Sequence, residues 1–250
     1  MTKGREMYHS IEWTPERIER FWNFYSGNAA AHGNYFSKQF GGAILALVRG
    51  RVRLAGPVVD LGCGPGYFLE HLLRQGLACK AVDSSAEAIA SVRERFEGQP
   101  GFLGGSVGRL DRIPLMDGEV GAVFLIEVME HLTPDQTAAT YAEISRVLRP
   151  GGHLIITVPN AENLDANSVA CPECGCVFHR MQHLQRFTAE SLAQRMTAAG
   201  FTVAFSRGVA LKHFTGGRPA RAVGMLRQMA RRLQRRPSPN LVAVASRGVA

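Results

Sequence analysis

The chain has 250 residues and a net charge of +8, and 46% of its residues are hydrophobic and 20% are charged. This composition is typical of a globular protein and excludes long disorder or a collagen-like repeat. The longest apolar stretch, residues 43–48, is far shorter than the roughly 20 residues of a membrane-spanning helix. Residues 1–6 lack the apolar segment of a secretory signal, so we expect a cytoplasmic protein.

The basic residues are concentrated towards the C-terminus. No acidic residue follows Glu190 but 11 of the 29 basic residues do, which leaves residues 1–190 with 18 basic and 21 acidic groups, a net charge of −3. Residues 219–235 can form a helix whose apolar face is surrounded by arginines. Through residues 219–236 this helix can contact an anionic membrane surface or nucleic-acid phosphates, or it can pack on the protein with its arginines in solvent. Membrane contact is favoured over nucleic acid.

Strands alternate with helices along the chain, which predicts a mostly parallel sheet with helices on both faces. Helices are expected over residues 14–25, 35–49 (with Gly41-Gly42 as a candidate break), 66–75, 86–96, 133–149 and 189–199. Strands are expected over residues 57–61, 78–82, 101–105, 120–126, 153–158, 201–205 and 241–245. We expect residues 1–54 to form an N-terminal helical cover on an α/β domain over 55–250. This domain carries a Cys/His-rich insert at 159–186, expected to be irregular, and a basic helical insertion at 207–240.

A glycine-rich loop, Val58–Gly66, connects a predicted strand to a helix. Glycines at 62, 64 and 66 allow a sharp turn and a close approach of the backbone to a ligand. Asp60 precedes the loop, and Asp83 ends the next strand 23 positions later, where a carboxylate can accept both hydroxyl groups of a ribose. The spacing Gly-x-Gly-x-Gly differs from the Gly-x-Gly-x-x-Gly of dinucleotide sites. The pattern indicates a nucleoside-binding loop, and the alternative is a plain tight turn.

This loop, Glu127–Leu132 and the lead-in Leu148-Arg149-Pro150-Gly151-Gly152 resemble the class I S-adenosylmethionine-dependent methyltransferases over about residues 55–206. The resemblance implies a Rossmann-like seven-stranded sheet and S-adenosylmethionine as cofactor. It implies that Asp60, Gly62 and Gly64 hold the methionine end of the cofactor and that Asp83 holds its ribose. Other implied cofactor-site residues are Cys63, Gly66, Ser84, Leu110 and Glu127.

Two positions depart from the family pattern. Arg109 stands where many relatives have an acidic residue that contacts adenine, so the backbone at Arg109–Leu110 is expected to serve instead. Val120-Gly121 replaces the usual Phe-Asp pair at the start of the fourth strand.

Glu127, Glu130 and His131 directly follow the fourth predicted strand, at the edge of the sheet where open α/β folds bind ligands. These side chains can bind Mg²⁺ or another divalent cation, or act as a base and its orienting groups. The motif resembles that of ubiquinone-type O-methyltransferases and of small-RNA 3′-terminal 2′-O-methyltransferases, where it holds a metal that gathers substrate hydroxyl oxygens. The RNA enzymes add a later histidine after a Pro-Asn-x-Glu-x-Asn-like stretch. Here Pro159-Asn160-Ala161-Glu162-Asn163 is followed by His179 and His183. The alternative is that Glu130 and His131 only shape the loop.

The insert contains Cys171-x2-Cys174-x4-His179-x3-His183, a spacing similar to that of a zinc knuckle. Two thiolates on one turn and nearby imidazoles can bind Zn²⁺ tetrahedrally, with Cys176 as an alternative fourth ligand. His183 has a competing role. It lies shortly before Phe187-Thr188, where a helix is predicted to start, and in many methyltransferases a histidine at this place faces the substrate. The alternative is three incidental cysteines beside pocket histidines.

The predicted function is methyl transfer from S-adenosylmethionine to an oxygen of a small or lipid-like molecule. His131 or His183 is the predicted base, and Glu127 and Glu130 orient it or a metal. The alternatives are an RNA methyltransferase and a zinc-bearing module that binds the cofactor without turnover. The N-terminal aromatic residues are expected mainly in the core, with lining of the acceptor pocket as the alternative: Trp13, Trp22, Tyr25 and Tyr35.

Overall fold

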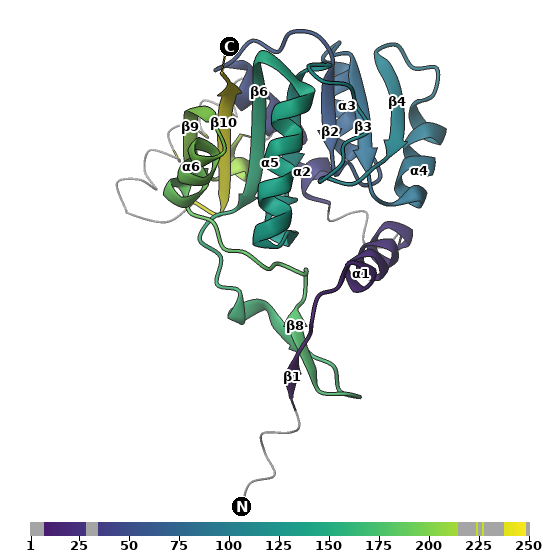
Figure 1. Ribbon diagram of the computed structural model, residues 1–250, viewed down its shortest axis with the longest axis vertical. Helices are drawn as coiled ribbons and strands as arrows, with labels where there is room; N and C mark the ends of the chain where they lie inside the picture. The colour runs from purple at the N-terminus through teal and green to yellow at the C-terminus, as the bar shows by residue number, and fades with distance from the viewer. Residues whose placement is uncertain (1–7, 29–34, 215–223, 225–226, 228–237, 249–250) are drawn as a thin grey trace, which may run out of the picture.

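A seven-stranded sheet forms the centre of the molecule (Figure 1). The computed structural model describes residues 8–28, 35–214, 224, 227 and 238–248. The strand order is β4-β3-β2-β5-β6-β10-β9, in which the first five strands run parallel and β10 is antiparallel to both of its neighbours. The strands are β2 Val58–Leu61, β3 Cys79–Asp83, β4 Phe102–Val107, β5 Val120–Ile126, β6 Leu148–Pro159, β9 Phe201–Val209 and β10 Asn240–Arg247. The predicted Rossmann-like sheet is confirmed.

Helices cover both faces of this sheet, as predicted. Alternate residues of a strand point to opposite faces, so Val58 packs in one hydrophobic core and Val59 in the other. Three helices supply the first core: α2 Phe36–Arg49, α3 Tyr67–Arg74 and α4 Ala86–Phe96. Two supply the second core: α5 Pro134–Val147 and α6 Ala189–Ala198. The α2 part of the predicted N-terminal cover is therefore built into the core of the α/β domain.

Glycines at two packing contacts explain departures from the expected pattern. The expected break at Gly41-Gly42 is wrong, because α2 runs through both residues. A Cβ atom at Gly41 would overlap the imidazole of His71 on α3, so glycine lets the two helices approach closely. A Cβ atom at Gly121 would overlap the carbonyl oxygen of Ala55. This contact accounts for Val120-Gly121 at the start of β5.

A second, smaller sheet lies outside the first (Figure 1). The insert expected to be irregular contains a hairpin of β7 (Ser168–Ala170) and β8 (Cys176–His179), and β1 (His9–Ser10) pairs with β8 in parallel. The chain continues from β1 into α1 (Pro15–Gly27), which begins after the N-cap residue Thr14. Short 3₁₀ helices are η2 Met129–His131, η3 Asp165–Asn167 and η4 Leu211–His213. The small sheet thus joins the N-terminal segment to the insert.

The basic insertion is shorter than predicted at its start, because β9 continues to Val209. Apart from Gly224 and Arg227, the helix predicted over 219–235 and its membrane contact lie outside the described residues. Among the described residues, no helix has the length and apolar character needed to cross a bilayer.

Candidate active site

The glycine loop turns at the carboxyl end of β2, between the buried Asp60 and the half-buried Asp83. Asp83, at the end of β3, accepts hydrogen bonds from the backbone N–H of Gly64 (2.8 Å) and of Ser85 (2.9 Å). Burial raises the pKa of Asp83, and these hydrogen bonds oppose the shift. Asp60 is 2% exposed, and its Oδ2 has no hydrogen-bond partner. Burial, and then the charge of Asp83, raise the pKa of Asp60 to about 8.

Glycine is required at two points of this loop. Gly62 has φ +75°, and a Cβ atom there would lie 2.7 Å from Val128 in the segment that follows β5. Gly66 adopts the left-handed conformation as N-cap of α3. Cys63 is buried between them, which raises the pKa of its thiol and keeps it protonated. The loop is therefore shaped to bring backbone groups close to a ligand at the edge of the sheet.

For the cofactor-site residues expected after β3 and β4, the structure gives positions and contacts within the protein. Ser84 directly follows Asp83 at the end of β3. The Arg109 side chain forms an ion pair with Asp111 (2.8 Å), and Leu110 packs against the hydrophobic core. The adenine contact at Arg109–Leu110 therefore stays a prediction.

Both glutamates of the Glu-x-x-Glu-His motif have buried carboxylate oxygens without a hydrogen-bond partner. Glu127 follows β5 with φ +54°, and its backbone N–H donates to the Thr157 carbonyl oxygen (2.9 Å). Glu130 lies in η2 and is 1% exposed. One oxygen of Glu127 and both oxygens of Glu130 lack a hydrogen-bond partner. Burial raises the pKa of Glu127 to about 8, and burial and then the charge of Glu127 raise that of Glu130 well above its usual range.

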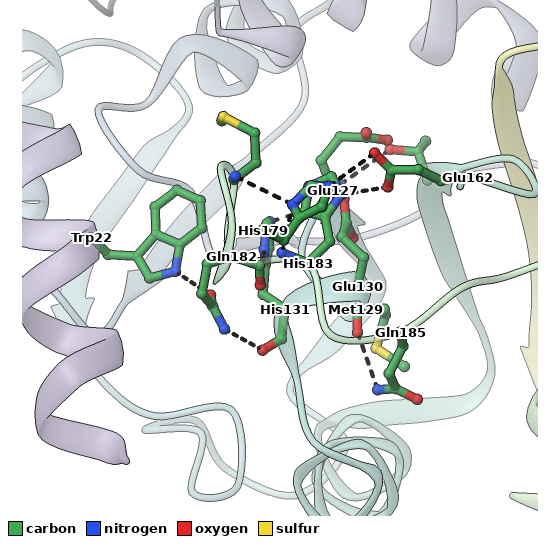
Figure 2. A network of polar contacts seen from close by, with 12 residues as sticks. Trp22, Glu127, Met129, Glu130, His131, Glu162, His179, Gln182, His183 and Gln185 are labelled. Atoms are coloured by element: carbon green, nitrogen blue, oxygen red, sulfur yellow. Dashed lines mark hydrogen bonds and ion pairs between the residues drawn. The ribbon is translucent and has the colours of Figure 1, made fainter. Parts of the chain in front are cut away.

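Three imidazoles lie next to these carboxylates (Figure 2). The ring of His183 lies 4.9 Å from that of His131 and 4.4 Å from that of His179. Glu162 connects two of them, with one oxygen 2.5 Å from His183 Nδ1 and the other 3.3 Å from His179 Nε2. Burial, and then His183, lower the pKa of His131 to about 3, so this ring is neutral at pH 7.

Segment 182–185 of the insert holds these groups together. The backbone N–H of Leu184 donates to the Glu130 carbonyl oxygen (2.7 Å). The Gln182 side-chain amide donates to the His131 carbonyl oxygen (3.0 Å). Gln185 donates to Thr137 Oγ1 (2.9 Å) at the start of α5. These bonds connect the insert to η2, which explains why histidines more than 45 positions along the chain reach the Glu-x-x-Glu-His motif.

Helix α1 covers the site. Trp22 Nε1 donates to Gln182 Oε1 (2.9 Å), and the Trp22 ring lies 4.6 Å from that of His131 (Figure 2). The hydroxyl of Tyr25 lies 3.5 Å from the sulfur of Met181. Trp22 therefore lies at the site and not in the core of the main sheet, where most of these aromatic residues were expected. Trp13 packs instead on Phe178 of β8, at 6.2 Å between ring centroids.

The sequence did not identify Glu162 or Gln182 as site residues. Glu162 stands in the Pro-Asn-Ala-Glu-Asn stretch that carries the resemblance to the RNA enzymes, and this stretch was the available signal. Gln182 is fully buried with φ +58°, and no sequence pattern indicates that conformation.

The predicted zinc ligand set requires a correction, because the structure does not bring Cys171, Cys174, His179 and His183 together. Cys171 and Cys174 lie at the tip of the β7–β8 hairpin, whereas His179 lies at its base opposite Ser168. β8 is extended, so three residue steps separate Cys176 from His179 by roughly 10 Å. Within the described residues, the clusters with metal-ligand spacing are Glu130-His131-His183 and Glu162-His179-His183.

These clusters have the composition of a divalent-cation site. A buried carboxylate without a partner is costly, and a bound cation removes that cost. The ligand atoms of Glu130, His131 and His183 lie within 4.8 Å of one another. His131 Nε2 lies 3.9 Å from a Glu130 oxygen, but its neutral imidazole does not form an ion pair with the carboxylate. The residues present therefore fit a cation bound by carboxylate and neutral imidazole groups.

A glycine loop and an acidic strand end at the carboxyl edge of a seven-stranded sheet define the methyltransferase class. A family model described as a methyltransferase domain matches residues 12–204. The chain belongs to this family, whose members use S-adenosylmethionine.

Curated relatives match shorter stretches of the chain. A probable S-adenosylmethionine-dependent methyltransferase of Mycolicibacterium smegmatis is 30% identical over 61% of this chain and 54% of its own. A ubiquinone biosynthesis O-methyltransferase of Xanthomonas oryzae is 32% identical over 46% of this chain and 48% of its own. The chain spans between 31% and 54% of the length of such relatives.

Solved structures share the fold. A putative methyltransferase of Haloferax volcanii, in complex with a methyltransferase activator, has a TM-score of 0.65 at 22% identity, covering 92% of this chain and 97% of its own. The Burkholderia thailandensis 1,6-didemethyltoxoflavin-N1-methyltransferase, bound to 1,6-didemethyltoxoflavin and S-adenosylhomocysteine, has a TM-score of 0.63 at 20% identity, covering 96% of this chain and 93% of its own. The likeness extends over nearly the whole chain.

Proposed function

We propose that the chain transfers the methyl group of S-adenosylmethionine to a hydroxyl oxygen of a small or lipid-like molecule. In this proposal Glu130, His131 and His183 hold a divalent cation that orients the acceptor. The observation that carries it is that both Glu130 oxygens are buried without hydrogen-bond partners and that one of them lies within 4.8 Å of a nitrogen of His131 and of His183. The ubiquinone biosynthesis O-methyltransferase among the relatives supports an oxygen acceptor.

The cofactor side follows from the two aspartates and the glycine loop. Asp83 is held by the Gly64 and Ser85 N–H groups, so its remaining lone pairs can accept both hydroxyl groups of the cofactor ribose. Asp60 and the backbone at Gly62 and Gly64 bind the methionine end, at the edge where β2 and β5 end. The methyl group is thereby directed towards the Glu130 cluster.

The acceptor side positions a hydroxyl group. A bound divalent cation lowers the pKa of a coordinated hydroxyl group. Glu162 holds His183 through Nδ1, a carboxylate–imidazole pairing that orients metal-binding histidines. Since both His131 and His183 then serve as ligands, Glu127 takes the place of the base predicted at either histidine: one of its oxygens is buried and unpartnered. Methyl transfer itself is an in-line displacement, so these residues contribute mainly proximity and a deprotonated acceptor.

The test is methyl transfer from isotopically labelled S-adenosylmethionine, with chelator-treated protein and then with added Mg²⁺ or Mn²⁺. The acceptor panel contains catechols and other vicinal diols, lipid hydroxyl compounds and RNA with a free 3′ end. We expect cation-dependent label on a small or lipid-like diol, lost in Glu130→Gln and kept in the exposed control Glu97→Gln. Label on RNA alone would move the substrate class to the polynucleotide, and cofactor binding without transfer to any acceptor would overturn the proposal.

A further inference from the structure

The hairpin tip brings three cysteines and a histidine side by side. Cys171 pairs directly with Cys176 across the hairpin, where the Cys171 N–H donates to the Cys176 carbonyl oxygen (2.8 Å). On the other side of β8, His9 of β1 is in register with Cys176, and its N–H donates to the Gly175 carbonyl oxygen (3.1 Å). Directly paired residues on neighbouring strands share a face of the sheet. Cys171, Cys176 and His9 therefore form a row on one face.

Cys174 lies in the turn of the hairpin, next to Cys171. The Gly175 N–H donates to the Cys171 carbonyl oxygen (2.9 Å), and Gly175 has φ +74°, which folds residues 171–175 back on themselves. Hydrogen bonds from the backbone of Cys174 and Glu173 and from the Cys174 side chain lower the pKa of the Cys171 thiol. The turn therefore directs N–H groups towards this sulfur, as thiolate–metal turns do.

Strand alternation separates this group from the candidate active site. Successive side chains of β8 point to opposite faces, so Cys176 and Phe178 share one face and Val177 and His179 the other. His179 is on the face of Glu162 and His183, whereas His9 is on the face of the cysteines. This places two separate sets of metal-ligand residues on one short sheet.

We propose that Cys171, Cys174, Cys176 and His9 bind a structural Zn²⁺ that fastens β1 to the β7–β8 hairpin. Three thiolates and one imidazole make a common closed tetrahedral set. The four ligand atoms are not gathered within 4.8 Å of one another, so binding rotates the side chains of Cys174 and His9, both of which are exposed. The inference is independent of the proposed function.

The position of the ion gives it a structural role. β1 has two residues, and a strand pairing this short is weak without further support. The chain runs from β1 into α1, whose Trp22 contacts Gln182 and His131. An ion at the tip thus fixes the N-terminal cover to the same insert that supplies His179 and His183.

The test uses Co²⁺ as a probe in place of zinc, with the full-length, reduced, metal-free protein. We expect one equivalent to give a thiolate-to-cobalt charge-transfer band with tetrahedral d–d bands. Cys171→Ser should lose the charge-transfer band. His9→Ala should weaken binding about 100-fold, since one of four ligands is lost. The matched control Ser10→Ala, on the other face of β1, should bind like the wild type. A cation at Glu130, His131 and His183 gives no such band because it has no thiolate ligand.

Calorimetry with S-adenosylmethionine checks that each variant is folded. Hydrogen exchange of residues 8–11 should slow when zinc is added to the wild type and not when it is added to Cys171→Ser. The absence of a charge-transfer band in the wild type would overturn the proposal, as would a band that survives Cys171→Ser. Weakening by His179→Ala, with none by His9→Ala, would return the fourth ligand to the other face of β8 and refute the site.

Discussion

Asp83 on the cofactor side and Glu130 on the acceptor side of the candidate active site have their carboxylates satisfied in opposite ways. On the cofactor side, Asp83 accepts two backbone hydrogen bonds from the loops that surround it. On the acceptor side, both oxygens of Glu130 are buried with no hydrogen-bond partner and a neutral imidazole for a neighbour. Backbone groups alone satisfy Asp83, whereas in our proposal Glu130 is satisfied by a bound cation.

The largest effect is expected from Asp83→Ala on the cofactor side. The change removes a charged acceptor of two hydrogen bonds that the ribose hydroxyl groups donate, which should weaken S-adenosylmethionine binding by about 1,000-fold. It also releases the N–H groups of Gly64 and Ser85. Isothermal calorimetry measures the affinity, with Glu130→Gln as the comparison variant that should bind the cofactor normally. An Asp83→Ala affinity within threefold of wild type would show that Asp83 does not hold the ribose.

The second-largest effect is expected from Glu162→Gln, which removes a carboxylate that supports the proposed cation site. Loss of the carboxylate that orients His183 and His179 should weaken divalent-cation affinity by about 10- to 100-fold. Cofactor affinity should not change, because Glu162 is on the acceptor side. Cation titration of the chelator-treated protein measures this, and an unaltered cation affinity would remove Glu162 from the site.

In the metal-free protein the pH dependence of stability reports on the buried carboxyl groups of both halves, since burial raises the pKa of Asp60 as well as that of Glu127 to about 8. Burial raises the pKa of Glu127 from its usual value near 4.5 to about 8. Between these values the folded state binds the proton that the unfolded state has released, so the free energy of unfolding falls as pH rises, by up to about 5 kcal/mol. Denaturant unfolding at pH 5, 6, 7 and 8 should show this decline, and Glu127→Gln or a saturating divalent cation should reduce it. A wild-type profile that rises from pH 5 to pH 8 would contradict the burial of an uncompensated carboxyl group.

The smallest effect is expected from Trp22→Phe. It keeps an aromatic ring next to His131 but removes the hydrogen bond to Gln182, a net loss of about 0.5–1.5 kcal/mol. We expect the KM for the acceptor to rise a few-fold while cofactor affinity is unchanged. Trp13→Phe is the matched control, because Trp13 packs on Phe178 away from the histidines. Equal effects of the two variants on KM would show that α1 contributes only stability.

The same contrast separates what the sequence predicts from what it does not. The glycine loop and both aspartates were predicted because they are local: a strand, a turn, a helix and the next strand follow one another without interruption and fix their positions. The strand expected over residues 153–158 starts earlier than predicted, since β6 begins at Leu148, which pairs with Val120.

The acceptor side depends on contacts between distant segments, which sequence spacing does not determine. Spacing assigned His179 and His183 to the cysteines, but the alternation of β8 puts Cys176 and His179 on opposite faces. The two-residue β1 has no periodic pattern to detect, and its pairing with β8 brings His9 to Cys176. Hydrogen bonds from segment 182–185 to η2 then decide where the histidines lie.

The most direct test of the contrast is a Mn²⁺ titration of chelator-treated protein, followed by the electron paramagnetic resonance signal of free Mn²⁺. Mn²⁺ prefers oxygen and imidazole ligands to thiolates, so the cysteines of the hairpin tip do not compete. One Mn²⁺ should bind per chain in the wild type and in Asp83→Ala, and none in Glu130→Gln. Wild-type protein that leaves the Mn²⁺ signal unchanged, or Glu130→Gln that still binds one equivalent, would contradict a cation site at these carboxylates.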